Sequence, residues 1–339
     1  MIDLLVVGAG PAGLATALHA ARRGLETVVV DARAAPLDKA CGEGLMPVAV
    51  RALADLGVTP RGHELRGIRY VDGRRHVDAA FRSGPGRGVR RTELQEALLD
   101  AVGAAGVPVL QRRVATVRQD GSSVCAAGIT ARYLAAADGL HSAIRDDVGL
   151  YGRPASRASR WGLRQHFVVA PWSDMVEVHW GPRAEVYVTP VGPELVGVAV
   201  LTGERAPFAE QLAAFPEVAS RLPPWTASRL RGAGPLHQPV RGRVAGRVLL
   251  VGDAAGYVDA LTGEGVAVAI ECAAALVRSV AEDRPDRYER RWLRASRRYR
   301  LITEALLWAR RRPMIAPAIV PAAARLPRTF AAAVNRLAR

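Results

Sequence analysis

The sequence predicts an α/β protein: a Rossmann-like nucleotide-binding domain, an inserted and mostly antiparallel β-sheet domain, and a helical C-terminal segment. Three observations support this prediction. Residues 3–31 follow the order strand, glycine-rich turn, helix, strand and acidic residue, which is typical of a dinucleotide-binding βαβ unit. Residues 161–201 contain four short strand-like segments separated by proline and glycine, as in an antiparallel sheet. After residue 252 the pattern is mainly helical.

The length and composition are those of a folded protein of about two domains. The 339 residues are 50% hydrophobic and 23% charged, which excludes general disorder and a fibrous protein. No apolar run reaches the roughly 18 residues that cross a bilayer, and the first residues show no basic leader or secretory cleavage site. Cys41, Cys125 and Cys272 are far apart and odd in number, so we expect reduced thiols and a cytoplasmic protein.

The first element is a strand at residues 3–7 that runs into a glycine turn at 8–13, GAGPAG. The three glycines allow a tight turn, close approach of the backbone to a pyrophosphate and close packing of helix on strand. The N-terminus of the following helix then faces the anion. A second strand, 26–30, ends at Asp31, which lies 18 residues after Gly13 and can accept hydrogen bonds from an adenosine ribose. A βαβ unit without a ligand is the less favoured alternative.

The middle of the chain continues with short elements. Residues 32–61 are loop-like and then helical, with the sequence CGEG at 41–44. Residues 62–85 alternate in hydropathy around an Asp-Gly turn and predict a hairpin. Apolar residues at helical spacing predict a helix at 91–105. Three strands are expected next, at 107–118, 123–127 and 132–137, the last ending in Asp138.

An inserted sheet follows. Its four strands are expected at 161–169, 175–180, 184–190 and 195–201. Alternation places Arg164 with His166 on one face of the first strand, and Glu177 with His179 on one face of the second. Together with Tyr187, such residues could orient or deprotonate a phenol, but exposure to solvent is the favoured interpretation. A buried strand at 247–251 then meets Gly252 and Asp253, and no histidine spacing indicates a metal site.

The net charge of +15 is concentrated at the C-terminus. Residues 287–339 hold fourteen arginines against Glu289 and Glu304, whereas Lys39 is the single lysine of the chain. Apolar residues at helical spacing are interleaved with these arginines. A solvated helix packed on the first domain is one interpretation, and a peripheral contact with anionic lipid or with an acidic carrier protein is the other. No nucleic-acid partner is expected, because stacking and groove-binding modules are missing.

Three glycine–acid motifs now stand in order, at 8–13 (GAGPAG), 136–145 (AADGLHSAIR) and 249–270 (LLVGDAAGYVDALTGEGVAVAI). Together they resemble the flavoprotein superfamily that includes para-hydroxybenzoate hydroxylase, other FAD-dependent aromatic monooxygenases and geranylgeranyl reductases. The resemblance covers about half of the chain. It implies a glutathione-reductase-type FAD-binding domain and an oxidoreductase that uses FAD, with NADPH or NADH as reductant.

The resemblance also implies which residues meet FAD. The glycines of the first motif would face the pyrophosphate and Asp31 the ribose, Asp253 would bond the ribityl chain, and the helix after Gly263 would point its N-terminal amides at the N1/O2 edge of the flavin. Physics supports that placement, because reduced flavin is anionic near N1. The full set of candidate cofactor-binding residues is Gly8, Gly10, Pro11, Ala12, Gly13, Asp31, Lys39, Cys41, Gly42, Arg91, Asp138, Gly252, Asp253, Gly263, Gly265 and Val266.

The motifs leave the subfamily open. Hydroxylases commonly carry a His where this chain has Gly256 and a Pro near the position of Ala260. The segment at 39–47 (KACGEGLMP) resembles the Cys-Gly-rich segment of the reductases. Their aromatic signature, Trp-x-Phe-Pro, is only echoed at 187–190. Halogenases share the scaffold, but their Trp-x-Trp-x-Ile-Pro signature is missing. Cys41 could contact the flavin, although a structural thiol is more common, and Lys39 could meet a phosphate or the flavin, or could be solvated.

The favoured function is therefore an NAD(P)H-dependent monooxygenase for a phenolic or polyketide-like substrate, which could be lipophilic, with Cys41, His166, His179 and Tyr187 as catalytic candidates. The first alternative is a C=C reductase of an isoprenoid, and the second is a non-catalytic flavin-binding or membrane-associated redox protein. The expected domains are an FAD-binding domain of residues 1–61, 86–152 and 238–283, a substrate domain of 62–85 and 153–237, and a C-terminal helical region of 284–339.

Overall fold

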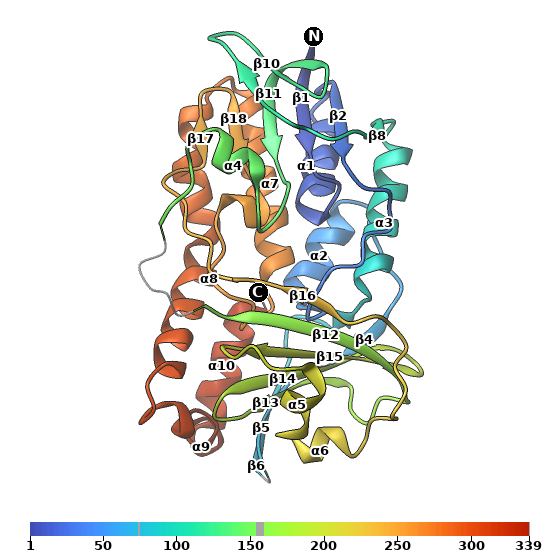
Figure 1. Ribbon diagram of the computed structural model, residues 1–339, viewed down its shortest axis with the longest axis vertical. Coiled ribbons are helices and arrows are strands. Elements are labelled where there is room, and N and C mark those ends of the chain that lie inside the picture. The colour runs from blue at the N-terminus through green and yellow to red at the C-terminus, as the bar shows by residue number, and fades with distance from the viewer. Residues whose placement is uncertain (74, 154–158, 339) are drawn as a thin grey trace.

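Two β-sheets organise the chain, one in each half of the elongated molecule (Figure 1). The computed structural model describes residues 1–73, 75–153 and 159–338. Residues 74 and 154–158, which fall in the predicted substrate domain, and residue 339 lie outside the described part. How the chain divides into domains remains a prediction.

The first sheet has eight strands and a parallel centre. Its main path runs β17-β18-β11-β1-β2-β8, and β10 and β9 extend it from β11. The last four residues of β1 and of β11 are buried and mainly apolar, as expected for parallel strands covered on both faces. The bounds are β1 (Ile2–Val7), β2 (Thr27–Asp31), β8 (Val109–Gln111), β9 (Arg118–Gln119), β10 (Val124–Ala126), β11 (Ile129–Ala136), β17 (Val244–Ala245) and β18 (Val248–Leu250).

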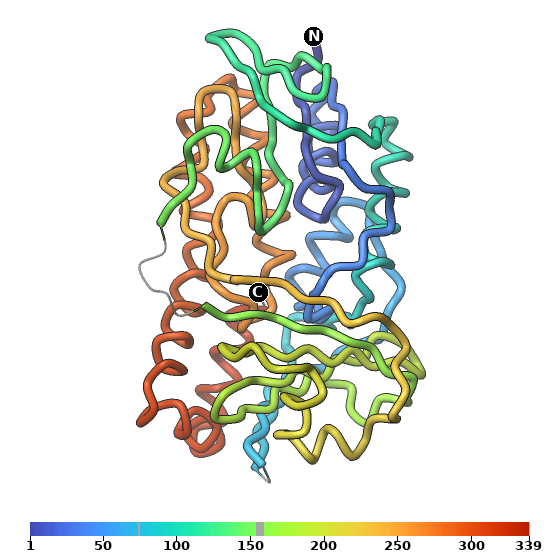
Figure 2. Tube along the Cα trace, in the orientation of Figure 1, coloured from blue at the N-terminus to red at the C-terminus, as the bar shows by residue number. Residues whose placement is uncertain are grey.

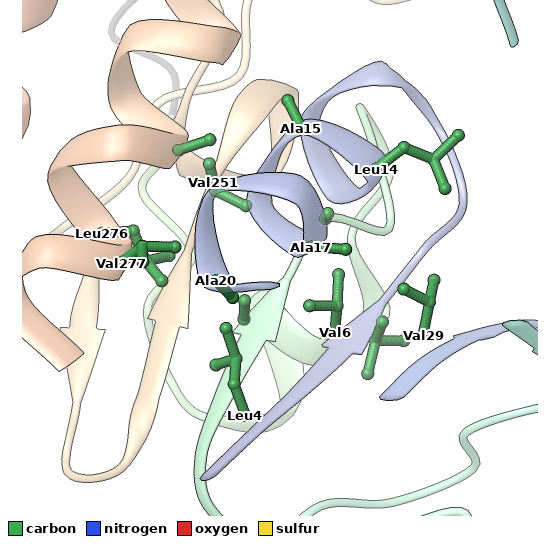
Figure 3. Packing of buried hydrophobic residues seen from close by; sticks show 14 of the residues in the cluster. Leu4, Val6, Leu14, Ala15, Ala17, Ala20, Val29, Val251, Leu276 and Val277 are labelled. Carbon is green, nitrogen blue, oxygen red and sulfur yellow. The ribbon is translucent and has the colours of Figure 1, made fainter. Parts of the chain in front are cut away.

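Helices cover this sheet. Figure 3 shows α1 and α7 side by side, with Ala17 and Ala20 of α1 close to Leu4 and Val6 of β1. Small side chains on α1 let the helix lie close to the strands, and the resulting packing excludes water. The bounds are α1 (Pro11–Ala21), α2 (Pro47–Asp55), α3 (Arg91–Ala104), α4 (Ala143–Asp147), the 3₁₀ turn η1 (Gly252–Ala255) and α7 (Gly265–Ala281).

The second sheet has seven strands in the order β16-β12-β15-β14-β13-β5-β6. All neighbours are antiparallel except β13 and β5, which are parallel. Two short helices and a three-stranded sheet, β3-β7-β4, adjoin it. The bounds are β3 (Gly44–Leu45), β4 (His63–Leu65), β5 (Gly67–Asp72), β6 (Arg75–Ala80), β7 (Gly86–Gly88), β12 (Trp161–Val168), β13 (Met175–Trp180), β14 (Ala184–Gly192), β15 (Leu195–Thr202), α5 (Phe208–Ala213), α6 (Pro216–Ala219) and β16 (Arg231–Ala233).

The C-terminal segment connects the two halves. Its elements are η2 (Pro285–Arg287), α8 (Tyr288–Arg310), η3 (Ala316–Ala318), α9 (Ile319–Arg325) and α10 (Pro327–Leu337). Helix α8 runs along one side of the molecule (Figures 1 and 2). At its start the Tyr288 hydroxyl donates to the Leu250 carbonyl (2.8 Å), and at its end Arg310 donates to the Gly181 carbonyl (3.0 Å). Helix α10 packs on β6, where Asn335 donates to the Ala80 carbonyl (2.8 Å).

The predicted fold class is confirmed, with two corrections of detail. The strand expected at 107–118 is wrong as a single element, since β8 and β9 are separate and residues 112–117 join them. The C-terminal segment packs on both halves rather than on the first alone. None of the helices in the described residues is long and apolar enough to span a bilayer.

Candidate functional site

A cavity of about 1710 Å³ lies between the two sheets and extends to the C-terminal helices. All three glycine–acid motifs reach its wall. Of the sixteen candidate cofactor-binding residues, fifteen line it. The exception is Gly13, which faces the strand beneath α1. The structure therefore brings together residues that are up to about 250 positions apart in the chain.

Two helix N-termini open into this cavity. Helix α1 begins at Pro11 after Gly10, and α7 begins at Gly265 after Glu264. In the part of the chain that the structure describes, no side chain caps either end. The first N–H groups of a helix have no partner within the helix, and the helix dipole adds positive potential there. An anion is the natural partner of each end, and FAD carries two such groups: its diphosphate and the N1/O2 edge of its reduced ring.

The glycine turn holds the first of these ends in place. A Cβ on Gly8 would lie 2.3 Å from the Ala137 carbonyl oxygen, and one on Gly13 would lie 1.8 Å from that of Gly8. Strand β1, strand β11 and α1 thus meet at distances that only glycine permits. Asp31 completes the turn, because its Oδ2 accepts a hydrogen bond from the Ala9 amide (2.9 Å). Its carboxylate lines the cavity and keeps lone pairs for a ribose hydroxyl.

Charged side chains surround the same region. Burial lowers the pKa of Lys39, and the neighbouring Arg33 and Arg91 lower it further. Burial raises the pKa of Asp253, and the positive charges of Arg91 and Lys39 partly counteract this rise. A diphosphate near these cations would relieve their mutual repulsion. The uncapped helix ends, the glycine cradle and this charge distribution fit FAD.

The CGEG segment is held by a buried network that the sequence did not reveal. Glu43 has a left-handed backbone (φ 58°). Its Oε2 lies 2.7 Å from His166 Nε2, and its Oε1 accepts from the Arg91 amide (2.9 Å). The His166 ring also meets Ser228 Oγ (2.9 Å) and Arg164. An acidic residue between two glycines was the available signal, but only the fold shows what Glu43 contacts.

The catalytic candidates separate into two groups. Cys41 and Tyr187 line the cavity, whereas His166 and His179 are outside its wall. The favoured expectation that both histidines face solvent is wrong: each is buried among carboxylates, His166 against Glu43 and His179 between Glu177 and Glu217 (3.2 Å each). The alternation itself is correct, but the face is covered by other parts of the chain.

Cys41 and Tyr187 are neutral groups. Burial raises the pKa of the Cys41 thiol, so it stays protonated. Burial also raises the pKa of Tyr187, whose hydroxyl donates to the Leu261 carbonyl (2.9 Å). The hydroxyl proton of Tyr187 is therefore engaged in a hydrogen bond within the protein and is not free to bond a substrate. Neither residue offers an anionic nucleophile or base.

Among the acidic lining residues that were not predicted from the sequence, Asp259 and Glu264 have raised pKa values. Burial raises the pKa of Asp259 to about 6, although Arg160 lies 3.2 Å away. Burial raises the pKa of Glu264 to about 7, with Arg298 opposing, and its Oε2 has no hydrogen-bond partner among the described residues. Glu264 lies inside the third motif, directly before α7. It is a carboxyl group that can carry a proton near neutral pH.

A Glu264→Gln variant is expected to change how stability depends on pH. Since the folded pKa of about 7 is above the ordinary 4.5, the stability associated with the neutral carboxyl is complete below pH 4.5 and is lost as the pH rises through 7. The amide does not ionise, so urea unfolding should find the variant more stable than the wild type at alkaline pH, by up to about 3 kcal/mol, with little gain in acid. An equal difference at both pH values would contradict the assignment.

The rest of the cavity, here called the apolar arm, is different in character. Its walls come from the second sheet and from α8–α10, and its lining residues from these helices carry no charge. They are Ile302, Ala305, Leu306, Ala309, Ile319, Ala322, Ala323, Leu326, Thr329, Phe330, Ala333, Val334 and Leu337. Across from them, the sheet contributes Ile68, Tyr70, Val176, Val178, Ala199 and Leu201. Such a surface suits a long apolar molecule. In the described residues, no group of three or more His, Cys, Asp or Glu could hold a metal ion.

Comparisons with known proteins agree with this geometry. The family described as an FAD binding domain matches residues 1–206. The menaquinone reductase of Mycobacterium tuberculosis is 31% identical, with 79% of this chain and 74% of that protein covered. Digeranylgeranylglycerophospholipid reductase 1 of Methanothermobacter thermautotrophicus is 30% identical, with 78% and 73% covered.

Solved structures show the same fold at lower identity. A flavoprotein/dehydrogenase from Cytophaga hutchinsonii superposes with a TM-score of 0.79 at 18% identity and covers 90% of this chain and 85% of its own. A flavin-dependent brominase superposes with a TM-score of 0.83 at 15% identity, with 99% and 93% covered. At such identities the likeness concerns the fold alone.

Proposed function

Because this chain belongs to the FAD binding domain family, we propose that it is an FAD-dependent reductase that saturates a carbon–carbon double bond in a lipid with an isoprenoid chain. The observation that carries the proposal is the continuity of the cavity: a charged part that fits FAD opens into the apolar arm. FAD is supported by the family and by the site. The reductase chemistry, the substrate class and NADPH or NADH as reductant are proposals.

The size and lining of the apolar arm support a long substrate. The whole cavity, at about 1710 Å³, exceeds the roughly 300–1,000 Å³ of ordinary ligand sites, which leaves room for a second molecule beside FAD. An isoprenoid chain has no polar atoms, so it can lie against Ile302, Leu306 and Phe330 without leaving a polar group unpaired. The names of the two reductase relatives, which specify a menaquinone and a digeranylgeranyl phospholipid, agree with this substrate class.

Saturation of a double bond adds one hydride and one proton. Reduced FAD, when bound, supplies the hydride. The N-terminal amides of α1 and α7 would hold the cofactor, and Lys39 and Arg91 would balance its charge. The apolar walls exclude water from the reacting carbons. The proton needs a donor beside the reacting carbons, and Glu264 suits this role because it lines the cavity and its pKa is about 7.

Hydroxylation of a phenol, which the sequence alone favoured, is less well supported by this site. A phenol needs a polar partner that orients it or removes its proton. The Tyr187 hydroxyl is bonded to the Leu261 carbonyl, and His166 and His179 are outside the wall. A polyketide-like substrate would meet mainly alkyl surface in the apolar arm.

Oxygen dependence distinguishes the two reactions. The FAD-loaded protein, reduced under anaerobic conditions, is mixed with an unsaturated isoprenoid quinone or phospholipid or with a panel of phenols. We expect anaerobic reoxidation of the flavin by the isoprenoid and recovery of a product two hydrogens heavier. Oxygen uptake stimulated by a phenol, without anaerobic turnover, would identify a monooxygenase and contradict the proposal. If no compound changes the rate of flavin reduction or reoxidation, the non-catalytic alternative holds.

A further inference from the structure

Exposed lining residues indicate that the apolar arm reaches the surface at the C-terminal helices. Five of its lining residues are also exposed to solvent, four of them in α8–α10 and the fifth, Leu326, in the turn between α9 and α10. They are Ala305, Ala322, Leu326, Thr329 and Ala333. We call this opening the C-terminal mouth. It lies in the last part of the chain, which is red in Figure 2.

Large apolar side chains are also exposed in the same C-terminal segment. Leu301 is 57% exposed, Trp308 53%, Met314 93% and Leu326 59%. These residues lie in α8, in the turn after it and in the turn between α9 and α10. So many large exposed apolar side chains in one short part of the chain indicate an interaction surface.

The same segment is strongly positive. Residues 305–338 contain no aspartate or glutamate, and the exposed arginines there are Arg311, Arg312, Arg325, Arg328 and Arg336. The Arg312 guanidinium lies 3.7 Å from the centre of the Trp308 ring. An arginine stacked on an exposed tryptophan combines a group that binds phosphate with a ring that prefers the membrane interface.

We propose that the C-terminal mouth docks on an anionic lipid bilayer. Trp308, Met314 and Leu326 would enter the boundary between headgroups and acyl chains, and the arginines would bind lipid phosphates. A bilayer accounts for apolar and positive groups together, whereas an acidic protein partner would account mainly for the arginines. The docking does not depend on the proposed function. Passage of a substrate from the bilayer through the mouth into the apolar arm does rest on the proposed function.

Vesicle binding tests the docking without any substrate. The FAD-loaded protein is sedimented with phosphatidylcholine vesicles that contain or lack phosphatidylglycerol. We expect binding only to the anionic vesicles, and loss of affinity at high salt. Arg311→Gln with Arg312→Gln should weaken binding roughly 30-fold, and Trp308→Ala about tenfold.

Trp225→Ala is the matched control. Trp225 is 66% exposed but lies after α6, far along the chain from the mouth, so its removal should leave vesicle binding unchanged. Absence of binding to anionic vesicles, or equal losses for Trp308→Ala and Trp225→Ala, would overturn the proposal. A protein that binds these vesicles but reduces no isoprenoid would contradict the proposed function alone. A protein that reduces a detergent-dispersed isoprenoid but ignores vesicles would contradict the docking alone.

Discussion

A Gly13→Ala variant is expected to lack bound FAD and to lose about 3 kcal/mol of stability, the upper end of the usual cost of overpacking. The new Cβ would lie 1.8 Å from the Gly8 carbonyl oxygen and 3.2 Å from the Ala137 side chain. Backbone at both places is fixed by the sheet, so α1 would have to move away from β1. That movement would carry the N-terminus of α1 out of the cavity wall. Flavin content per chain and urea unfolding measure the two effects.

Gly103→Ala provides the control. Gly103 lies in α3, is exposed, and has no atom within 4 Å of the position of a new Cβ. Alanine has the higher helix propensity, so this variant should gain roughly 0.5–1 kcal/mol and keep its flavin. If Gly13→Ala loads FAD as the wild type does, the glycine turn does not hold the cofactor in the way described above.

The second large effect is expected at Glu185, at the junction of the second sheet and α8. Glu185 is fully buried, with Arg160 at 2.5 Å and Arg310 also paired to it. Glu185→Gln would leave the two guanidinium groups without their shared anion, which typically costs about 3–5 kcal/mol for a buried pair. Asp259 remains beside Arg160 (3.2 Å), so Arg160 keeps one carboxylate partner. Arg310 is therefore the guanidinium group most affected by the substitution. Urea unfolding should show it, together with loosened attachment of the end of α8.

Glu304→Gln is the matched substitution for this test. The Glu304 side chain is 52% exposed and lies 3.7 Å from Arg300, a surface pair worth less than about 1 kcal/mol. Comparable losses in the two variants would show that the buried pair contributes no more than an exposed one.

Local sequence patterns were enough for the fold and for the nucleotide end of the cavity. Three features belong to this end: the glycine turn, Asp31 and the helix after Gly263. The conformation of each is determined by neighbouring residues within one βα unit. The three motifs converge because the carboxyl ends of parallel strands β1, β11 and β18 lie at one edge of the sheet.

The remaining parts of the site depend on contacts between distant segments. Gly88 is an example: a Cβ there would lie 1.7 Å from the Pro190 carbonyl oxygen, so β7 and β14 meet closely although about 100 residues separate them. Burial of His166 behind Glu43 also results from a contact between distant segments of the chain. Alternation identifies which residues share a face, but only the tertiary packing decides what covers that face.

The apolar arm is the largest part of the site that the sequence did not predict. The interleaved arginine and apolar residues of 287–339 predicted helices, and they are present as α8–α10. Nothing in their spacing indicated that Leu306 and Phe330 would line the same cavity as Gly8 and Asp253. That placement follows from α8 spanning both halves of the molecule (Figure 1).

The central claim is that FAD and a long apolar molecule occupy one continuous cavity. It is tested most directly by titrating the FAD-loaded protein with a saturated twenty-carbon isoprenoid alcohol and following the flavin absorption spectrum. We predict a saturable shift of the flavin bands with the long alcohol and none with its five-carbon analogue. A colourless protein that takes up no FAD, or a flavin spectrum that the long alcohol leaves unchanged at saturation, would contradict the claim.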